Sequence, residues 1–295
     1  MRRLINILAC ARWIALALLW LTAAGAAQAE SADNIADTYA PFQSLLDRYL
    51  TEQPTPCGGL ISWFDYAAAL AASDTSDLLR EQDAMLAEFD TDTLDTRPAA
   101  IAFWANAYNY FMLQHLLTHL DDGQLVSSVR DYGSLFDPYK VFGIERFAIG
   151  GQQYSLRAIE LDVLLGDAFA ERGWKDARVH FAVNCASVGC PALRQVIFEP
   201  DTLETMLSEN TRQALDTSLH LVRDGNTLRV TSLFDWYHDD FVEQSGSVRE
   251  FILEYGSDTA AAAVEATNRI RYIDYNWQLN RSEHYMDLNN TPCPP

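Results

Sequence analysis

The sequence lacks several short motifs by which enzymes bind phosphate groups or activate a nucleophile. It has no glycine-rich phosphate-binding loop, no G-x-S-x-G segment and no C-x-x-C pair. These absences argue against a nucleotide-binding enzyme, a serine hydrolase of the nucleophile-elbow type and a thioredoxin-type redox protein. His115 and His119 have the spacing of zinc ligands on a helix, but Leu116 occupies the position of the glutamate in H-E-x-x-H. We expect neither a metal nor another cofactor.

Basic residues are scarce as well. The chain has 21 lysines and arginines against 41 aspartates and glutamates, which gives a formal charge of -20 at pH 7. Such a negative surface repels phosphate backbones and anionic lipid headgroups, so we expect neither nucleic acid nor a membrane surface as a partner. Charge alone could indicate disorder, but 49% of the residues are hydrophobic and 12% are aromatic, as in a chain that folds around a core.

Long apolar runs are absent after the first part of the chain. Two arginines precede the one long run, over residues 4–21, and an A-x-A cleavage site ends at Ala29. This order predicts a signal peptide over residues 1–29. An uncleaved membrane anchor is the alternative, although Arg12 interrupts the run. We expect an exported, periplasmic or secreted protein without membrane contact after cleavage, and the loss of three leader arginines lowers its charge from -20 to -23.

Cleavage leaves four cysteines, namely Cys57, Cys185, Cys190 and Cys293. An even number in an oxidising compartment favours disulfides, and four cysteines allow three connectivities. We favour a Cys57–Cys293 bridge, because it would fix the proline-rich C-terminal tail to an early loop. Closing so long a loop would stabilise the fold by on the order of 4–5 kcal/mol in the chain-entropy model. Cys185 and Cys190 then either bond to each other or serve in chemistry.

The order of the expected elements indicates an α+β fold. Apolar spacing predicts three amphipathic helices between residues 35 and 89, and then a helix over residues 100–120 that is apolar on most sides. Later segments predict hairpins within residues 141–156 and residues 219–231. Helices first and hairpin-joined strands later are typical of α+β proteins. We expect a long buried central helix packed on a small, mostly antiparallel sheet.

The segment over residues 178–191 contains the residue types of a thiol active site. We predict a short buried strand over residues 178–184, followed by Cys185. His180 and Cys185 could form a nucleophile and its base. Five residues of straight strand span roughly 16 Å, so their contact requires a sharp turn directly after the strand. The alternative is a structural disulfide between Cys185 and Cys190 that clamps the end of the strand.

Five blocks of the sequence are similar to those of a known family. They are F-W-x-N-A-Y-N over residues 103–109, G-G-x-x-Y-S-L-x-x-I-E over 150–160, H-F-A-x-N-C-x-S-x-x-C-P over 180–191, a W-Y-x-x-D-F segment within 232–241, and Y-N-W-x-L-N over 275–280. With these blocks the chain resembles the proteins called domain of unknown function 547. We therefore expect a core domain over residues 100–280, preceded by a helical segment over 30–99 and followed by a tail over 281–295.

The resemblance implies a fold distantly similar to papain-like and transglutaminase-like thiol enzymes. Such enzymes transfer acyl groups with a cysteine, a histidine and an acidic or amide group that orients the histidine. Carried onto this chain, the resemblance implies Cys185 as the nucleophile, His180 as its base and Glu160 as the orienting group. Asn106 and Asn184 would supply supporting amide hydrogen bonds. One departure is that papain-like enzymes carry the cysteine on their central helix, where this chain has none.

Three hypotheses for function follow. The first is an exported thiol-dependent hydrolase or acyltransferase that acts on a small peptide or amide through an acyl-cysteine. The second is a non-catalytic binding module in which the Cys185–Cys190 disulfide is structural. The third is a redox role in which these two cysteines cycle between thiol and disulfide. The acidic surface favours a small molecule or peptide as the ligand, and the sequence leaves the oligomeric state open.

Overall fold

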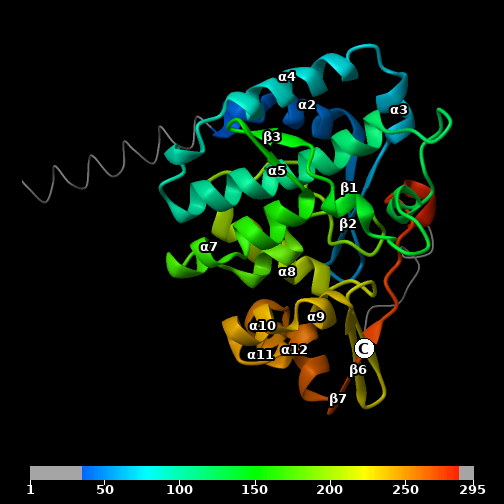
Figure 1. Ribbon diagram of the computed structural model, residues 1–295. Coiled ribbons are helices and arrows are strands. Elements are labelled where there is room, and N and C mark those ends of the chain that lie inside the picture. Colours follow the sequence, from blue (N-terminus) through cyan, green and yellow to red (C-terminus); the bar gives the residue numbers. More distant parts are fainter. Residues whose placement is uncertain (1–34, 286–295) are drawn as a thin grey trace, which may run out of the picture.

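The long apolar segment forms helix α5 (Arg97–Thr118), which runs through the centre of the computed structural model (Figure 1). The structure describes residues 35–285. Thr96 caps the helix by accepting a hydrogen bond from Ala99 N, and Pro98 lies in the first turn, where it removes no helical hydrogen bond. All but four of the 22 residues of α5 are buried, as expected for a helix that is apolar on every side.

The chain before α5 places its helices on one side of α5, and its pair of strands runs past α5 toward α8 (Figure 1). This part consists of α2 (Ala40–Tyr49), the antiparallel strands β1 (Leu50–Pro54) and β2 (Leu60–Phe64), α3 (Tyr66–Ala71) and α4 (Thr75–Glu88). The buried side chain of Gln82 joins α4 to the start of α2, because it accepts from Phe42 N and donates to Thr38 O. The three helices were predicted. The hairpin between the first two was not, because its strands alternate too weakly to stand out.

A second hairpin lies against α5. Its strands are β3 (Phe147–Ile149) and β4 (Gln152–Tyr154), and the short elements η1 (Thr91–Thr93), η2 (Val129–Tyr132) and α6 (Lys140–Gly143) precede it. Phe111 of α5 stacks on Phe147, with ring centres 4.5 Å apart. Gly150 N donates to Leu86 O at the end of α4, which satisfies one of the free carbonyls of that helix. The central helix therefore packs on a small antiparallel hairpin, as predicted.

The segment that was expected to be a strand is helical. Residues 177–181 form the 3-10 helix η4 (Ala177–Phe181), between α7 (Asp167–Glu171) and α8 (Leu203–Leu215). Asp176 caps η4 by accepting a hydrogen bond from Arg178 N. The predicted burial is correct, but a short apolar run does not distinguish a buried strand from a buried helical turn. The capping aspartate was the local signal for a helical start.

The C-terminal part forms a separate layer at one end of the fold, with helices drawn in orange in Figure 1. Strands β5 (Leu221–Asp224) and β6 (Thr227–Thr231) are antiparallel, and β6 pairs in parallel with β7 (Arg269–Ile273). Between β6 and β7 lie α9 (Leu233–Trp236), α10 (His238–Ser245), α11 (Val248–Tyr255) and α12 (Asp258–Glu265). A second hydrophobic core forms here around Phe181, Phe234, Phe241 and Phe251. The α+β class with small, mostly antiparallel sheets is confirmed.

Some expectations fall on parts of the chain outside the described residues. The predicted signal peptide over residues 1–29 lies there, and so does Cys293, so the predicted Cys57–Cys293 bridge stays a prediction. Within residues 35–285, no helix combines the length and the apolar character needed to cross a bilayer.

Candidate functional site

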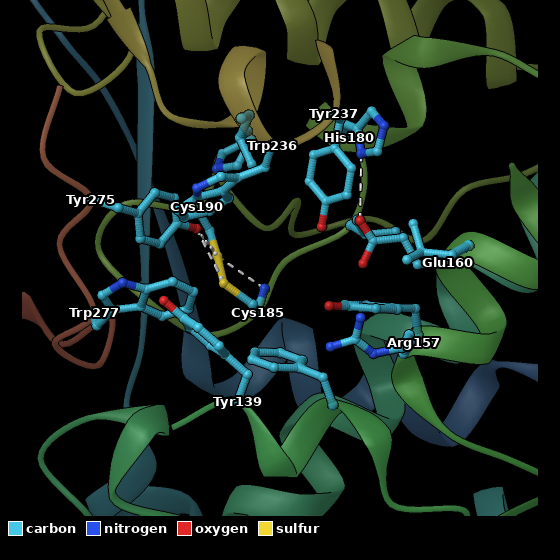
Figure 2. Close-up of a pocket in the computed structure, with 16 residues that line it drawn as sticks. Tyr139, Arg157, Glu160, His180, Cys185, Cys190, Trp236, Tyr237, Tyr275 and Trp277 are labelled. Carbon is cyan, nitrogen blue, oxygen red and sulfur yellow. Dashed lines mark hydrogen bonds and ion pairs between the residues drawn. A yellow bond between two sulfur atoms is a disulfide. The ribbon is translucent and has the colours of Figure 1, made fainter. Parts of the chain in front are cut away.

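A pocket of about 390 Å³ opens between α5, the segment around Glu160, η4 and the loop that carries the two cysteines. Glu160, His180 and Cys185, which the resemblance implies as catalytic, all line this pocket, and so does Cys190. Figure 2 shows aromatic side chains along one side, the disulfide in the middle and Arg157 and Glu160 on the opposite side. The fold thus brings residues of two separate sequence blocks, 150–160 and 180–191, to one cavity.

The loop over residues 185–190 turns back on itself. Cys185 and Cys190 form a disulfide, with their Cα atoms 6.2 Å apart. The side chain of Asn184 holds the loop at its base, because it accepts from Ala186 N at 2.8 Å and donates to Pro191 O at 2.7 Å. Ala186 has a φ of 60°, a left-handed conformation that an alanine rarely adopts. The predicted sharp turn after Asn184 is therefore present, and Asn184 stabilises it.

Tyr275 contacts both sulfur atoms of the disulfide. Its hydroxyl oxygen lies 3.2 Å from Cys185 Sγ and 3.1 Å from Cys190 Sγ. Burial raises the pKa of Tyr275 well above its usual value, so the hydroxyl keeps its proton. Gly189 allows this approach, because a Cβ at that position would lie 2.9 Å from the ring of Tyr275. Close packing of ring and loop thus requires the glycine.

His180 lies between two carboxylates. Its Nε2 is 2.9 Å from Asp240 Oδ2, and its Nδ1 is 3.4 Å from Glu160 Oε1, a distance of an ion pair without the alignment of a hydrogen bond. Its ring stacks on Tyr237 with centres 3.8 Å apart. Burial disfavours the charged imidazole, but Asp240 and Glu160 outweigh burial and raise the pKa of His180. The two carboxylates therefore favour the protonated form of His180.

Asp240 is the partner that the sequence analysis missed. It lies 60 residues from His180, on α10, and it also pairs with Lys175 Nζ at 2.8 Å. Burial acts to raise the pKa of Asp240, but its bonds to His180 and Lys175 lower it overall. The W-Y-x-x-D-F block contains this aspartate, which was the signal that could have identified it.

Glu160 and Arg157 come from an irregular helix. Residues 158–164 form the π-helix η3 (Ala158–Leu164), and Arg157 is its N-terminal neighbour. A π-helix turns side chains to directions that a regular helix does not offer, and it often occurs at functional sites. Glu160 is buried and forms the ion pair with His180. Arg157 is exposed, and its guanidinium group points into the pocket in Figure 2.

The two asparagines of the candidate set are structural in this fold. Asn106 donates to Phe198 O and accepts from Phe198 N, both at 2.8 Å, so its amide is used on both sides. Asn184 is bound in the loop described above, and its backbone N donates to Asn109 Oδ1. Neither amide lines the pocket within the described chain. The structure thus brings Cys185, His180 and Glu160 together and leaves Asn106 and Asn184 outside. The catalytic roles of all five residues stay predictions.

Aromatic side chains form the other wall. Trp236 stacks on Trp277 with ring centres 5.7 Å apart, and Tyr275 and Tyr139 contact Trp277 at 4.5 and 5.2 Å. Trp236 is 44% exposed, which is unusual for so large an apolar side chain and leaves its ring open to a ligand. Trp236 follows β6, whereas Tyr275 and Trp277 follow β7. The wall is therefore built where two parallel neighbouring strands end.

The histidine pair of α5 lies outside this pocket. The rings of His115 and His119 stack 4.5 Å apart, and Arg146 donates to both, at 2.7 Å to His115 Nδ1 and 2.7 Å to His119 Nε2. Burial lowers the pKa of His115 to about 3. Both rings therefore act as neutral acceptors for a guanidinium cation.

Comparison with known proteins finds a family model that matches part of the chain. No curated protein and no solved structure matches the chain. A family model matches residues 92–214, a range that includes α5, Glu160, His180 and both cysteines of the loop. This range ends before Asp240 and before Trp236, Tyr275 and Trp277 of the aromatic wall. Residues 92–214 match the model of the family described as "Protein of unknown function, DUF547", which supports the resemblance seen in the sequence.

Proposed function

We propose that the protein binds a small peptide or another amide-containing ligand in the pocket beside the Cys185–Cys190 disulfide. The observation that carries this proposal is the composition of the pocket, with stacked aromatic rings on one side and Arg157 on the other. Ligand sites are typically apolar cavities of about 300–1,000 Å³ with a few polar groups that fix orientation, and this pocket has both properties. The disulfide is then part of the wall that shapes the site.

The aromatic wall and the guanidinium group of Arg157 indicate how such a ligand would be held. The exposed ring of Trp236, supported by Trp277, offers a flat apolar surface for a side chain or an amide plane. Among the described residues 35–285 that line the pocket, Arg157 offers the only exposed guanidinium group, and it suits a carboxylate. A peptide with a free C-terminus satisfies both. The strongly acidic chain selects against large polyanions that would otherwise compete for the arginine.

Calorimetric titration with a set of dipeptides and tripeptides tests this proposal. Each peptide is compared with its C-terminal amide, and we expect the free carboxylate to bind about tenfold more tightly because of Arg157. Arg157→Gln should abolish this preference. Arg172→Gln is the matched control, since Arg172 stacks on Trp174, which does not line the pocket. If no peptide binds, or if both variants behave alike, the proposal is wrong.

A second candidate function is acyl transfer by Cys185 after reduction of the disulfide. Its support is the half-buried Cys185 in the same pocket as His180 and Glu160. In this reaction the Cys185 thiolate attacks an amide or thioester carbonyl, the amine or thiol leaves, and water hydrolyses the acyl-cysteine. The proton that His180 would exchange is the one it now shares with Asp240. Asp240 and Glu160 favour the imidazole that already carries its proton, and this form cannot take a further proton from the Cys185 thiol, so binding is the better supported function.

Mass spectrometry of the reduced protein separates the two candidates. With small thioesters, an acyl group on Cys185 that turns over would establish the acyl-transfer function, and Cys185→Ser should abolish it. If no acyl-cysteine forms and the protein still binds peptide, the acyl-transfer function is ruled out and only the binding function stands.

We also propose that the protein is exported, because residues 1–29 have the composition of a signal peptide. Edman sequencing of the protein isolated from cell fractions tests this. A chain that begins at Glu30 in a periplasmic or extracellular fraction supports export, and an intact N-terminus contradicts it.

A further inference from the structure

The two sulfur atoms of the Cys185–Cys190 disulfide have different surroundings. Cys185 is half-buried, whereas only 5% of Cys190 is exposed. The backbone N–H of Cys185 donates to Cys190 Sγ at 3.0 Å, and the Tyr275 hydroxyl lies 3.1 Å from the same sulfur. A small molecule in the pocket therefore reaches Cys185 more easily. The Tyr275 hydroxyl lies near both sulfur atoms and Ser187 Oγ lies near Cys185 Sγ, but only Cys190 Sγ accepts a backbone N–H.

This difference predicts which sulfur of the disulfide an incoming thiolate attacks and which sulfur leaves. In thiol–disulfide exchange, a thiolate attacks one sulfur and the other leaves as a thiolate. The reaction is fastest when the attacked sulfur is accessible and the leaving thiolate is stabilised. Hydrogen bonds to an ionised group are about twice as strong as those to a neutral one. The Cys185 N–H, which donates only to Cys190 Sγ, and the Tyr275 hydroxyl, which can turn to it, therefore favour the departure of Cys190 as a thiolate. The geometry matches attack at Cys185.

We propose that the pocket binds a thiol-containing small molecule, such as a cysteine-containing peptide, and exchanges it with this disulfide. The ligand thiolate attacks Cys185 Sγ, the bond between Cys185 and Cys190 breaks, and its electron pair goes to Cys190 Sγ. The products are a mixed disulfide between the ligand and Cys185 and a Cys190 thiolate. The ligand sulfur is oxidised and Cys190 is reduced, so no further reagent is needed. In the reverse step, Cys190 attacks Cys185 and releases the ligand thiolate.

The scaffold is suited to keep Cys190 in place after the bond breaks. Asn184 joins Ala186 N to Pro191 O, so the base of the loop stays closed without the disulfide. Ser187 Oγ lies 3.2 Å from Cys185 Sγ and offers a further polar contact on the side of the mixed disulfide. The Cys190 thiolate therefore remains next to Cys185 and is poised for the reverse step.

This inference rests on the proposed function of the pocket as a ligand site. Its test distinguishes failure of the disulfide exchange from failure of ligand binding. The exported protein, purified without reductant, is mixed briefly with glutathione, quenched with N-ethylmaleimide and digested for peptide mass spectrometry. We expect glutathione on Cys185 and the maleimide on Cys190. Glutathione on Cys190, or no mixed disulfide, overturns the exchange. Calorimetry with S-methylglutathione, which cannot exchange, tests the pocket alone: binding of this analogue without exchange leaves the proposed function standing, and its failure to bind counts against the pocket.

Loss of the Tyr275 hydroxyl tests the role of the donors. Tyr275→Phe should slow formation of the mixed disulfide roughly tenfold, because one of two bonds to the leaving thiolate is lost. Tyr272→Phe removes a hydroxyl from the same C-terminal segment, away from the pocket lining, and should leave the rate unchanged. Circular dichroism of both variants checks their folding. Equal rates for Tyr275→Phe and the wild type would contradict the proposed stabilisation of Cys190.

Discussion

His180 donates a hydrogen bond of 2.9 Å from Nε2 to Oδ2 of Asp240, which lies on a helix 60 residues further along the chain. The bond connects η4, next to the central helix, with α10 in the C-terminal layer. His180 is fully buried and Asp240 is partly buried, so this contact joins the two parts of the fold largely out of reach of solvent. The pocket lies at the same junction, and its shape therefore depends on an ion pair that the sequence spacing does not reveal.

The charge on His180 predicts how stability depends on pH. Its pKa is raised in the folded protein, so the folded state holds the proton more tightly than the unfolded chain. The resulting stabilisation is complete below the unfolded pKa of about 6.5 and is lost as the pH rises through the folded value. We expect the free energy of unfolding to fall in this range above pH 6.5. Urea unfolding at a series of pH values measures it, and His180→Gln should remove this part of the slope.

Removal of the carboxylate partner should also be costly. Asp240→Asn leaves the buried His180 with only the poorly aligned Glu160, and loss of one partner of a buried ion pair costs about 3 kcal/mol. Asp239→Asn is the matched control, because Asp239 is a fully exposed neighbour whose loss should change the free energy of unfolding by less than about 0.5 kcal/mol. Equal effects of the two changes on urea unfolding would rule out a structural role for the His180–Asp240 pair.

Acidification should destabilise the fold through a different histidine. Burial lowers the pKa of His220 in the folded protein to about 4. In the unfolded chain the same side chain has a pKa of about 6.5, so between these two values it is neutral in the folded state and protonated in the unfolded state. This stabilisation is present above pH 6.5 and is lost as the pH falls toward 4. We expect His220→Asn to lose less stability than the wild type between pH 6.5 and 4. His238→Gln, at an exposed site, should follow the wild type, and a steeper loss in His220→Asn would refute this account.

The glycine beneath Tyr275 should be required for the shape of the pocket. A Cβ at position 189 would lie 2.9 Å from the Tyr275 ring, so Gly189→Ala should displace the ring and cost about 1–3 kcal/mol by overpacking. Peptide affinity should fall as well. Gly143→Ala is the control, because nothing lies within 4 Å of a Cβ there. Thermal unfolding and calorimetry on both variants measure the difference, and an unchanged Gly189→Ala would contradict the packing described here.

A substitution at Asn106 tests whether this side chain stabilises the fold or takes part in the functional site. Asn106→Ala leaves Phe198 N and O without their buried partner, which costs about 2 kcal/mol. Because Asn106 does not line the pocket, the variant that remains folded should bind peptide with wild-type affinity. A large loss of affinity at unchanged stability would instead support the implied role in the site.

Some of the structure could be predicted from local signals. The apolar segment after Pro98 predicts α5, and the turn at Gly225 predicts the hairpin of β5 and β6. These features depend on residues close in sequence, for which periodicity and turn chemistry suffice. The family blocks also identified Glu160, His180 and Cys185, which the structure brings to one pocket.

Other features depend on contacts between distant residues. The apolar run before Cys185 is compatible with a strand and with a helical turn. The structure has a helical turn, which Asp176 caps by accepting a hydrogen bond from Arg178 N. The π-helix at Glu160 has no signal in the spacing of apolar residues. Asp240 resembles any exposed acid on a helix, and only the tertiary fold brings it to His180. The electrostatics of the site could therefore not be derived from the sequence.

Photo-crosslinking tests the central claim, that the pocket binds a small peptide, most directly. A tripeptide that carries a photoreactive phenylalanine analogue and a free carboxylate is irradiated with the oxidised protein, and labelled residues are mapped by mass spectrometry. The account predicts labels on Trp236, Tyr275 or Trp277, which competing unlabelled peptide removes and Arg157→Gln weakens. Labels elsewhere on the surface, or labels that excess peptide does not displace, would contradict it.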